Sequence, residues 1–380
     1  MFGKSFKLFT LFGFEIKVDL SWIVIAVLIA WTFANGLFPA TVEGLTTATY
    51  WWMGVAAATG LFLSIIFHEL WHSLIARRYG LQMKGITLFI FGGVSEMTEE
   101  PKSARVEFWM ALAGPLSSVI LAGVFYGAYG LARGAILPEP RAVTEVFRNL
   151  GYLNLLLAGF NILPAFPLDG GRVLRAAIWA ANKNMLSATR IASLVGSAFG
   201  VLLIGGGILL ALFLGNPIAG IWYALIGWFL WTAARSSYQQ VLVRKGLEGI
   251  TVAKLMEAKP VTVPRALSVE RLVDDYIYKH TFKMYPVVDG DRLAGCVTLQ
   301  KVKDVPRTEW GVTTVGAIAA GCAPDNTISP SADAMEALAQ MSRGRVSRLM
   351  VVDGDRLVGI ITLKDMLEFL SVKLELQDHK

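Results

Sequence analysis

The sequence predicts a polytopic α-helical membrane domain, with about six transmembrane helices, followed by a soluble α+β domain built from two repeats. Of the 380 residues, 54% are hydrophobic and only 17% are charged, and the mean hydropathy is +0.54. Long apolar runs continue to about Arg235 and then stop. Beyond that point Tyr285–Leu299 recurs as Leu349–Leu363, which is a period of 64 residues. High hydropathy indicates membrane spans, and the repeat indicates a folded tandem outside the bilayer.

Six apolar runs are long enough to cross a bilayer core of about 30 Å. They lie at residues 20–38, 51–76, 106–132, 146–166, 188–214 and 217–236. Lysine and arginine are concentrated in the segments that would lie on the same side as the N-terminus, and the opposite loops carry few. By the positive-inside rule, we expect a multi-pass protein of the cell membrane with a cytoplasmic N-terminus and a cytoplasmic C-terminal domain.

The net charge of +6 does not indicate nucleic-acid binding. The basic residues lie beside the ends of apolar runs instead of forming clusters with interleaved aromatic residues. The two cysteines, Cys296 and Cys322, are too few for a disulfide framework and lack the spacing of a metal site. They fit a reducing compartment, and we expect no chemical role for them.

The second apolar run contains the pattern H-E-x-x-H at His68, Glu69 and His72. On a helix, residues four apart share a face, so both imidazoles can reach one Zn²⁺ and Glu69 can hold a water beside it. Ionisable groups at membrane depth are costly and usually mark a functional site. Histidines that only bond neighbouring helices would explain one of these residues, but not two at ligand spacing with a carboxylate between them. The sequence therefore predicts a zinc site.

A second polar segment, Asn161–Arg172, interrupts the fourth apolar run with two prolines and two glycines. These residues place Asp169 on irregular backbone, which at membrane depth must line protein or a water-filled cavity. Asp169 can then be the third zinc ligand, and the fourth position stays available for water, as in a hydrolytic zinc site. Taken alone, Asp-Gly-Gly is typical of a helix-terminal turn. The H-E-x-x-H pattern in the same membrane favours the ligand.

Four shorter patterns predict local structure around these residues. Phe14–Asp19 alternates apolar and polar residues, as a half-buried strand does. Ile86–Val94 is too short to span a bilayer and ends near two glycines, which predicts a β-hairpin or re-entrant strand that could pair with an extended peptide; a surface linker resting on the membrane is the alternative. Gly114-Pro115 predicts a packing kink without a chemical role, and the Gly196-x-x-x-Gly200 pattern predicts close helix packing.

H-E-x-x-H in one span, together with N-x-x-P-x-x-P-L-D-G-G-R in a later one, resembles the site-2 protease family of intramembrane zinc metalloproteases. The resemblance covers about residues 1–240. It implies that His68, His72 and Asp169 bind one zinc ion per chain and that Glu69 is the catalytic acid and base.

The same resemblance implies roles for three further residues and contains one departure. It implies that Asn161 lies near the substrate peptide or its oxyanion, and that Gly92 and Gly93 belong to a substrate-handling hairpin. The departure is Trp71, at a position where the family commonly has glycine. A bulky side chain there could narrow substrate access or change the helix contact behind the metal, but it removes no ligand.

Each copy of the C-terminal repeat reads as a helix, a strand, an Asp-Gly hairpin turn, a second strand and another helix. This tandem resembles a pair of cystathionine-β-synthase (CBS) domains. The resemblance implies an adenine nucleotide, ATP or AMP, held by Thr362 and Asp365, whereas the first copy has Thr298 with Lys301. A dimerisation module without a ligand is the alternative. The predicted boundaries are 1–240 for the membrane domain, 241–249 for a linker, and 250–312 and 313–376 for the repeats.

The sequence thus predicts an intramembrane zinc endopeptidase that hydrolyses peptide bonds of transmembrane substrates, in regulated intramembrane proteolysis. Its activity would be modulated by a nucleotide at the CBS pair or by homo-oligomer assembly through it. One alternative is a CBS-gated membrane transporter or channel, which gives no reason for H-E-x-x-H beside a distant Asp-Gly-Gly. The other is a catalytically silent membrane adaptor, against which the intact ligand set argues.

Overall fold

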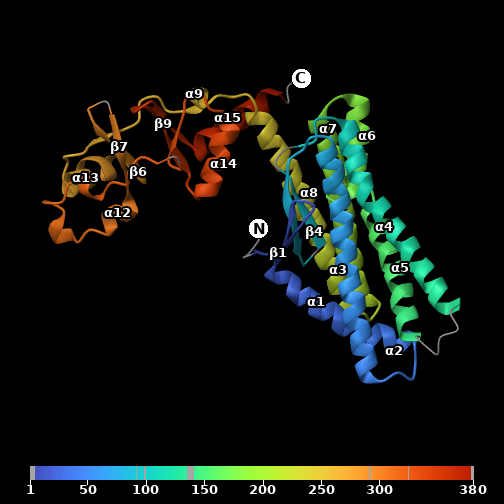
Figure 1. Cartoon of the computed structure of the whole chain (residues 1–380). Coiled ribbons are helices and arrows are strands. Elements are labelled where there is room, and N and C mark those ends of the chain that lie inside the picture. The colour runs from blue at the N-terminus through green and yellow to red at the C-terminus, as the bar shows by residue number, and fades with distance from the viewer. Residues whose placement is uncertain are drawn as a thin grey trace. The chain divides into compact units, whose positions relative to one another are not determined.

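The computed structural model of the chain describes residues 5–90, 92–97, 100–134, 141–290, 292–323 and 325–377 (Figure 1). The chain divides into two compact units, Met1–Gln239 and Gln240–Lys380. The first unit is mainly helical with a small sheet, and the second combines a sheet with short helices. This division agrees with the predicted fold class.

Long helices form most of the first unit. They are α1 (Leu20–Thr32), a π-helical turn (Phe33–Leu37), α2 (Phe38–Thr41), α3 (Thr47–Arg78), α4 (Ala104–Gly134), α5 (Arg141–Asn161), α6 (Asp169–Asn182), α7 (Met185–Phe213) and α8 (Pro217–Leu247). Within the described residues, five helical segments are long and apolar enough to cross a membrane: Leu20–Thr41, Thr47–Arg78, Ala104–Arg133, Met185–Phe213 and Pro217–Leu247. They correspond to five of the six predicted spans.

The sixth predicted span, 146–166, forms α5, which does not reach the same hydropathy. Its first half is polar because it contains Arg141, Glu145, Arg148 and Asn149, and Arg148 forms an ion pair with Glu145 at 2.6 Å. The segment between the fourth and fifth predicted spans is also helical, because Asp169–Asn182 folds into the helix α6. A membrane crossing by α5 stays a prediction.

A four-stranded sheet completes the first unit and lies beside α3 (Figure 1). Its strands are β1 (Ser5–Leu11), β2 (Phe14–Asp19), β3 (Met83–Phe89) and β4 (Gly92–Met97), in the order β1-β2-β3-β4. The β1–β2 and β3–β4 pairs are antiparallel, and β2–β3 is parallel. Ile16 and Ile86 of the sheet share a buried cluster with Ile66 and Leu70 of α3. The predicted strand at residues 14–19 and the predicted β-hairpin are confirmed.

Glycine allows close packing in the last two membrane helices. A Cβ at Gly200 of α7 would lie 2.7 Å from the carbonyl oxygen of Gly227 in α8, and a Cβ at Gly207 would lie 2.5 Å from that of Gly220. The predicted close helix contact is therefore confirmed at Gly200. Gly196 instead abuts the backbone of Phe166, in the loop between α5 and α6.

The second unit contains one six-stranded sheet in the order β5-β6-β7-β10-β9-β8. The strands are β5 (Val263–Pro264), β6 (Met284–Asp289), β7 (Arg292–Thr298), β8 (Thr327–Ile328), β9 (Arg348–Asp353) and β10 (Arg356–Thr362). The helical elements are α9 (Val252–Leu255), α10 (Val269–Arg271), a π-helical turn (Leu272–Ile277), α11 (Tyr278–His280), α12 (Leu299–Lys303), a 3₁₀ turn (Arg307–Glu309), α13 (Val315–Ile318), α14 (Ala334–Gly344) and α15 (Leu363–Gln377).

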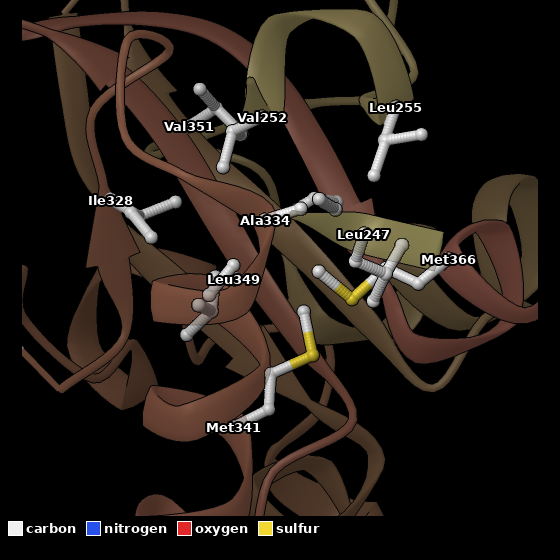
Figure 2. Packing of buried hydrophobic residues seen from close by; sticks show 11 residues of the cluster. Leu247, Val252, Leu255, Ile328, Ala334, Met341, Leu349, Val351 and Met366 are labelled. Carbon is white, nitrogen blue, oxygen red and sulfur yellow. The ribbon is translucent and has the colours of Figure 1, made fainter. Parts of the chain in front are cut away.

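The strand order shows two copies related by pseudosymmetry, as the repeat predicts. The hairpins β6–β7 and β9–β10 pair antiparallel, and Gly290 and Gly354 in their turns both have a φ of +61°. Each copy has a separate buried cluster. The cluster of the second copy, drawn in Figure 2, includes Leu247 at the end of α8 together with Leu349 and Met366. The helix α8 therefore continues through most of the segment predicted as a linker.

The two copies also exchange short segments. Glu257, which precedes the first copy's strands, pairs with Ile360 in β10 through backbone hydrogen bonds of 2.8 and 3.0 Å. Correspondingly, Ala320 pairs with Cys296 in β7 at 2.8 and 2.9 Å. Each copy is thus completed by backbone that precedes the strands of the other one.

Candidate metal and catalytic site

The H-E-x-x-H residues lie on α3, a helix of 32 residues. Thr46 caps its N-terminus by accepting a hydrogen bond from the Thr49 backbone N–H, and Arg77 and Arg78 occupy its last turn, where positive charge complements the helix dipole. His68 and His72 are 3% and 4% exposed, and their ring centroids are 4.9 Å apart. The predicted single face with two buried imidazoles is present.

Asp169 is the first residue of α6, so the prediction of irregular backbone at this position was wrong: the irregular, proline-containing segment ends at Leu168, the N-cap of the helix. Its Oδ2 atom lies 3.0 Å from His68 Nε2 and 3.1 Å from His72 Nε2. The carboxylate is buried, and it comes from 101 residues farther along the chain than His68. The structure therefore brings the three predicted zinc ligands together from two different helices.

The other ring nitrogen of each histidine contacts α4. His68 Nδ1 lies 2.9 Å from Ser118 Oγ, and His72 Nδ1 lies 2.6 Å from the carbonyl oxygen of Met110. A carbonyl only accepts, so His72 Nδ1 donates, and in the neutral ring Nε2 then carries a lone pair. Two Nε2 atoms opposite a carboxylate form a donor set that suits Zn²⁺, with the ring orientations fixed by α4.

Gly114 lets α4 approach this donor set. A Cβ at Gly114 would overlap the Nε2 atoms of both His68 and His72. The sequence-based prediction gave Gly114-Pro115 a packing kink without a chemical role, and the structure instead places Gly114 directly at the ligand atoms. The signal in the sequence is the spacing of four between Met110, Gly114 and Ser118, which puts all three on one face of a helix.

A cavity of about 370 Å³ opens beside His68, a predicted zinc ligand, and Glu69, the predicted base. Its wall includes His68 and Glu69 of α3, Gly92 and Gly93 of β4, and Asn161 at the end of α5. The remaining lining is mostly apolar and includes Trp22, Ile25, Ile29, Phe62, Ile65, Leu88, Phe89, Ile90, Leu157, Phe160, Leu168, Trp222, Ile226, Phe229 and Leu230. Gly92, Gly93 and Asn161, which were predicted to handle the substrate, thus line one cavity with Glu69, the predicted base.

Two contacts define the polar part of this cavity. A Cβ at Gly93 would lie 2.6 Å from Glu69 Cγ, so only glycine lets β4 pass this close to the carboxylate. Asn161 donates from Nδ2 to the carbonyl oxygen of Leu157 at 2.9 Å, which holds its side chain against α5. Trp71 is not part of the cavity wall; its ring packs on Phe67, with centroids 6.1 Å apart.

A buried ion pair joins the two helices that meet at the site, and the sequence did not predict it. Glu107 of α4 is fully buried, and Arg175 of α6 is 3% exposed. Arg175 donates from both Nε, at 2.7 Å, and Nη2 to Glu107 Oε1, and its guanidinium lies 5.1 Å from the Phe166 ring centroid. Removing one partner from a buried pair is strongly destabilising. This pair therefore fixes α6, which carries Asp169, against α4.

The predicted nucleotide residues of the second unit satisfy each other. The Thr362 backbone N–H donates to Asp365 Oδ2 at 2.9 Å, and the Asp365 backbone N–H donates to Thr362 Oγ1 at 3.2 Å. This reciprocal arrangement is a capping box at the start of α15. In the first copy, the Lys301 backbone N–H donates to Thr298 Oγ1 at 3.4 Å, and the position of the carboxylate is taken by lysine.

Both cysteines are free. Cys296 is buried, and burial raises the pKa of its thiol. A raised pKa lowers the thiolate fraction, so Cys296 is a poor nucleophile at neutral pH.

Comparisons with known proteins identify the families to which the two units are similar. The profile of Peptidase family M50 matches residues 56–140 and 131–203, and that of the CBS domain matches 252–307 and 318–372. Rip3 from Mycobacterium tuberculosis is 35% identical over 363 residues, covering 95% of this chain and 91% of Rip3. Zinc metalloprotease MJ0392 from Methanocaldococcus jannaschii is 30% identical over 375 residues, covering 99% and 98%. The solved site-2 protease from M. jannaschii is 30% identical, covers 61% of this chain and 94% of that one, and has a TM-score of 0.42.

Proposed function

The chain belongs to peptidase family M50, as a zinc metalloprotease of the site-2 protease type with a CBS pair. From this family membership we propose that His68, His72 and Asp169 hold its zinc ion and that Glu69 is its general base. The single observation that carries the proposal is the convergence of Asp169 Oδ2 on both Nε2 atoms from a separate helix. Family membership and the apolar helices make the chain an intramembrane protease. The ligand and base assignments are the proposal.

The donor set fits zinc on its own chemistry. Two histidine nitrogens and one carboxylate leave a position for water, and the missing side chain at Gly114 keeps α4 clear of the Nε2 atoms. When bound, zinc supplies Lewis-acid polarisation of a water and of the scissile carbonyl. The contacts of His68 with Ser118 and of His72 with Met110 hold both rings in the orientation that such binding needs.

The chain's own residues then divide the work of hydrolysis. Glu69, at the cavity wall, takes a proton from the attacking water and passes it to the leaving amine nitrogen. The apolar remainder of the wall limits water to the polar end, where His68, Glu69 and Asn161 lie. An extended substrate segment can pair with β4, the edge strand that passes Glu69 at Gly93. We assign Asn161 to bonding the substrate backbone, and its position in the wall of the same cavity as Glu69 supports this assignment.

Membrane orientation and domain limits are part of the same proposal. We assign residues 1–240 to the protease domain, 241–249 to the junction, and 250–312 and 313–376 to the CBS repeats. The excess of lysine and arginine on one side supports a cytoplasmic N-terminus and CBS pair. Transport and adaptor functions receive no support, since the relatives that match nearly the whole chain include one named a zinc metalloprotease.

Control of the protease by an adenine nucleotide at the CBS pair, or by assembly of two chains through it, is a finer proposal. Asp365 lines a cavity of about 360 Å³ with apolar Leu255 and Phe369, which suits an adenosine group. Glu257 and Glu368 line it too, and carboxylates repel a polyphosphate. We therefore expect AMP to bind more tightly than ATP, which calorimetry on the purified full chain can measure; equal or reversed affinities would contradict the assignment.

The proposed chemistry is tested by cleavage of a labelled single-span substrate with the purified chain in detergent. Glu69→Gln should keep one zinc per chain and lose cleavage, because the amide cannot take the proton. Asp169→Ala should lose both zinc and cleavage, because a ligand is gone. Cleavage by Glu69→Gln at the wild-type rate would refute the base, and unchanged zinc content in Asp169→Ala would refute the ligand.

A further inference from the structure

The first strand of the chain has an unusual distribution of side chains. In β1, Phe6 is 57% exposed and Phe9 is 44% exposed, and Phe12 in the following turn is 65% exposed. Large aromatic side chains normally bury their surface, and contiguous exposed ones mark an interaction site. The question is which partner covers them.

The register of the sheet shows which face these residues occupy. Phe6 pairs with Val18 and Phe9 pairs with Ile16, and directly opposite residues share a face. Val18 and Ile16 are buried against α3. Phe6 and Phe9 therefore lie on the apolar face of the sheet, on a strand that the described helices leave exposed.

The opposite face is polar. Lys7 pairs with Lys17, and Thr10 pairs with Glu15. Glu15 accepts from Lys7 Nζ at 2.7 Å and lies 3.4 Å from Lys17 Nζ. These lysines hold the pKa of the Glu15 carboxyl below its usual range. Leu8, which is 55% exposed, lies at the register shift between Lys7 and Phe9 and has no paired residue. The paired residues of β1 are thus amphipathic, with phenylalanines on one face and charges on the other.

Both ends of β1 are attached to the same membrane surface. Ser5 pairs with Asp19, which caps the span that begins at Leu20. At the other end, Arg77 in the last turn of α3 donates to the Phe12 carbonyl oxygen at 2.7 Å. The first span begins, and the second span ends, on one side of the bilayer. The strand therefore runs at that surface.

We propose that β1 lies in the membrane–water interface, with Phe6, Phe9 and Phe12 among the lipids and the Lys7–Glu15–Lys17 cluster in water. The partner is the bilayer itself, because the pairing of Ser5 with Asp19 joins β1 to the start of the first span, where Leu20 is also 61% exposed. Interface depth also follows from the backbone: β1 is the edge of the sheet, and an unpaired edge is not tolerated in hydrocarbon. At the interface, headgroups and water satisfy it, as for other amphipathic surface elements.

Photo-crosslinking tests the proposal on the wild-type chain. The protein is reconstituted, one chain per nanodisc, in phosphatidylcholine carrying a diazirine near the headgroup end of one acyl chain. After illumination and trypsin digestion, mass spectrometry should find lipid adducts on the peptide Leu8–Lys17. The peptide Leu293–Lys301 of the second unit is the matched negative control, and peptides from α7 are the positive control. Adducts on α7 without any on Leu8–Lys17 would overturn the proposal.

Spin labelling resolves the two faces. In a Cys296→Ser, Cys322→Ser background, Phe9→Cys and Lys7→Cys are labelled separately in the same discs. The ratio of oxygen to nickel-chelate accessibility should be several-fold higher at position 9 than at position 7, because oxygen concentrates in lipid and the chelate in water. Equal ratios, or a burial of position 9 from both reagents that shows protein contact, would refute lipid as the partner. Elution as a single peak confirms that each variant is folded.

Discussion

The two units of this protein each carry a short polar motif, and the two motifs have different local surroundings. His68, His72 and Asp169 come from helices far apart in sequence, and their side-chain atoms meet one another. Thr362 and Asp365 are three residues apart, and each satisfies the other's backbone at a helix start. The first arrangement has no purpose in local folding, whereas the second is explained by capping alone. Convergence over a long sequence distance is therefore the stronger indication of chemistry.

The largest expected effect, on zinc binding and on cleavage, is at Gly114 beside the two histidines. Gly114→Ala places a Cβ on the Nε2 atoms of both histidines, so zinc binding and cleavage should be lost. Gly123→Ala on the same helix is the matched control, because nothing lies within 4 Å of that Cβ. Zinc content by mass spectrometry of the metal, alongside substrate cleavage, measures both. Full zinc occupancy in Gly114→Ala would show that the ligand atoms lie elsewhere.

A smaller effect is expected at Ser118, which contacts the Nδ1 atom of His68. Ser118→Ala should weaken zinc affinity or activity by about 10-fold to 100-fold, the usual cost of removing a partner that orients a metal ligand. Ser117→Ala is the control, since Ser117 bonds only its own helix, at the Gly114 carbonyl oxygen, in the contacts observed. Competition with a chelator gives the affinity. Equal affinities of the two variants would remove Ser118 from the site.

The smallest effect is expected at Asp365 in the second unit. A role in helix capping and a role in nucleotide binding predict different results there for stability and for AMP affinity. Asp365→Ala removes one half of the capping box and should lower the stability of this unit by about 1 kcal/mol. Zinc content should not change. Denaturant unfolding measures the stability loss, and calorimetry with AMP shows whether affinity falls as well. A loss of stability without any change in AMP affinity would leave Asp365 a structural residue.

The predictable parts of this molecule were those that depend on residue chemistry or on local periodicity. Ligand spacing singled out His68 and His72, and the Asp-Gly-Gly segment after the prolines singled out Asp169, although Asp169 begins a helix and does not lie on irregular backbone. The strand at Phe14–Asp19 followed from alternation, and the second-unit hairpins followed from Asp-Gly turns. Each of these signals lies within a few residues of sequence.

The parts that could not be predicted depend on which helix faces are neighbours. Gly114 matters because α4 passes the histidine nitrogens. Its spacing of four from Met110 and Ser118 shows a shared helix face, but not which helix that face meets. Glu107 and Arg175 were not singled out from the sequence, yet they form a buried pair. The helix α6 lies outside the predicted spans, because its 14 residues are too few to cross a bilayer core. Helix orientation about its own axis is a tertiary property, and single-sequence patterns do not contain it.

The exchange of segments between the CBS copies has a consequence for biosynthesis. Leu247, Val252 and Leu255 precede the strands of the first copy, but they are buried with Leu349 and Met366 of the second copy. During translation, the end of α8 therefore emerges long before its apolar partners exist. The second unit can complete its fold only after almost the whole chain has left the ribosome, whereas N-terminal regions usually fold first. A chain that ends before Leu349 would leave Leu247, Val252 and Leu255 without their partners and so expose them. Proteolytic quality control can detect an incomplete chain by such exposed apolar surface.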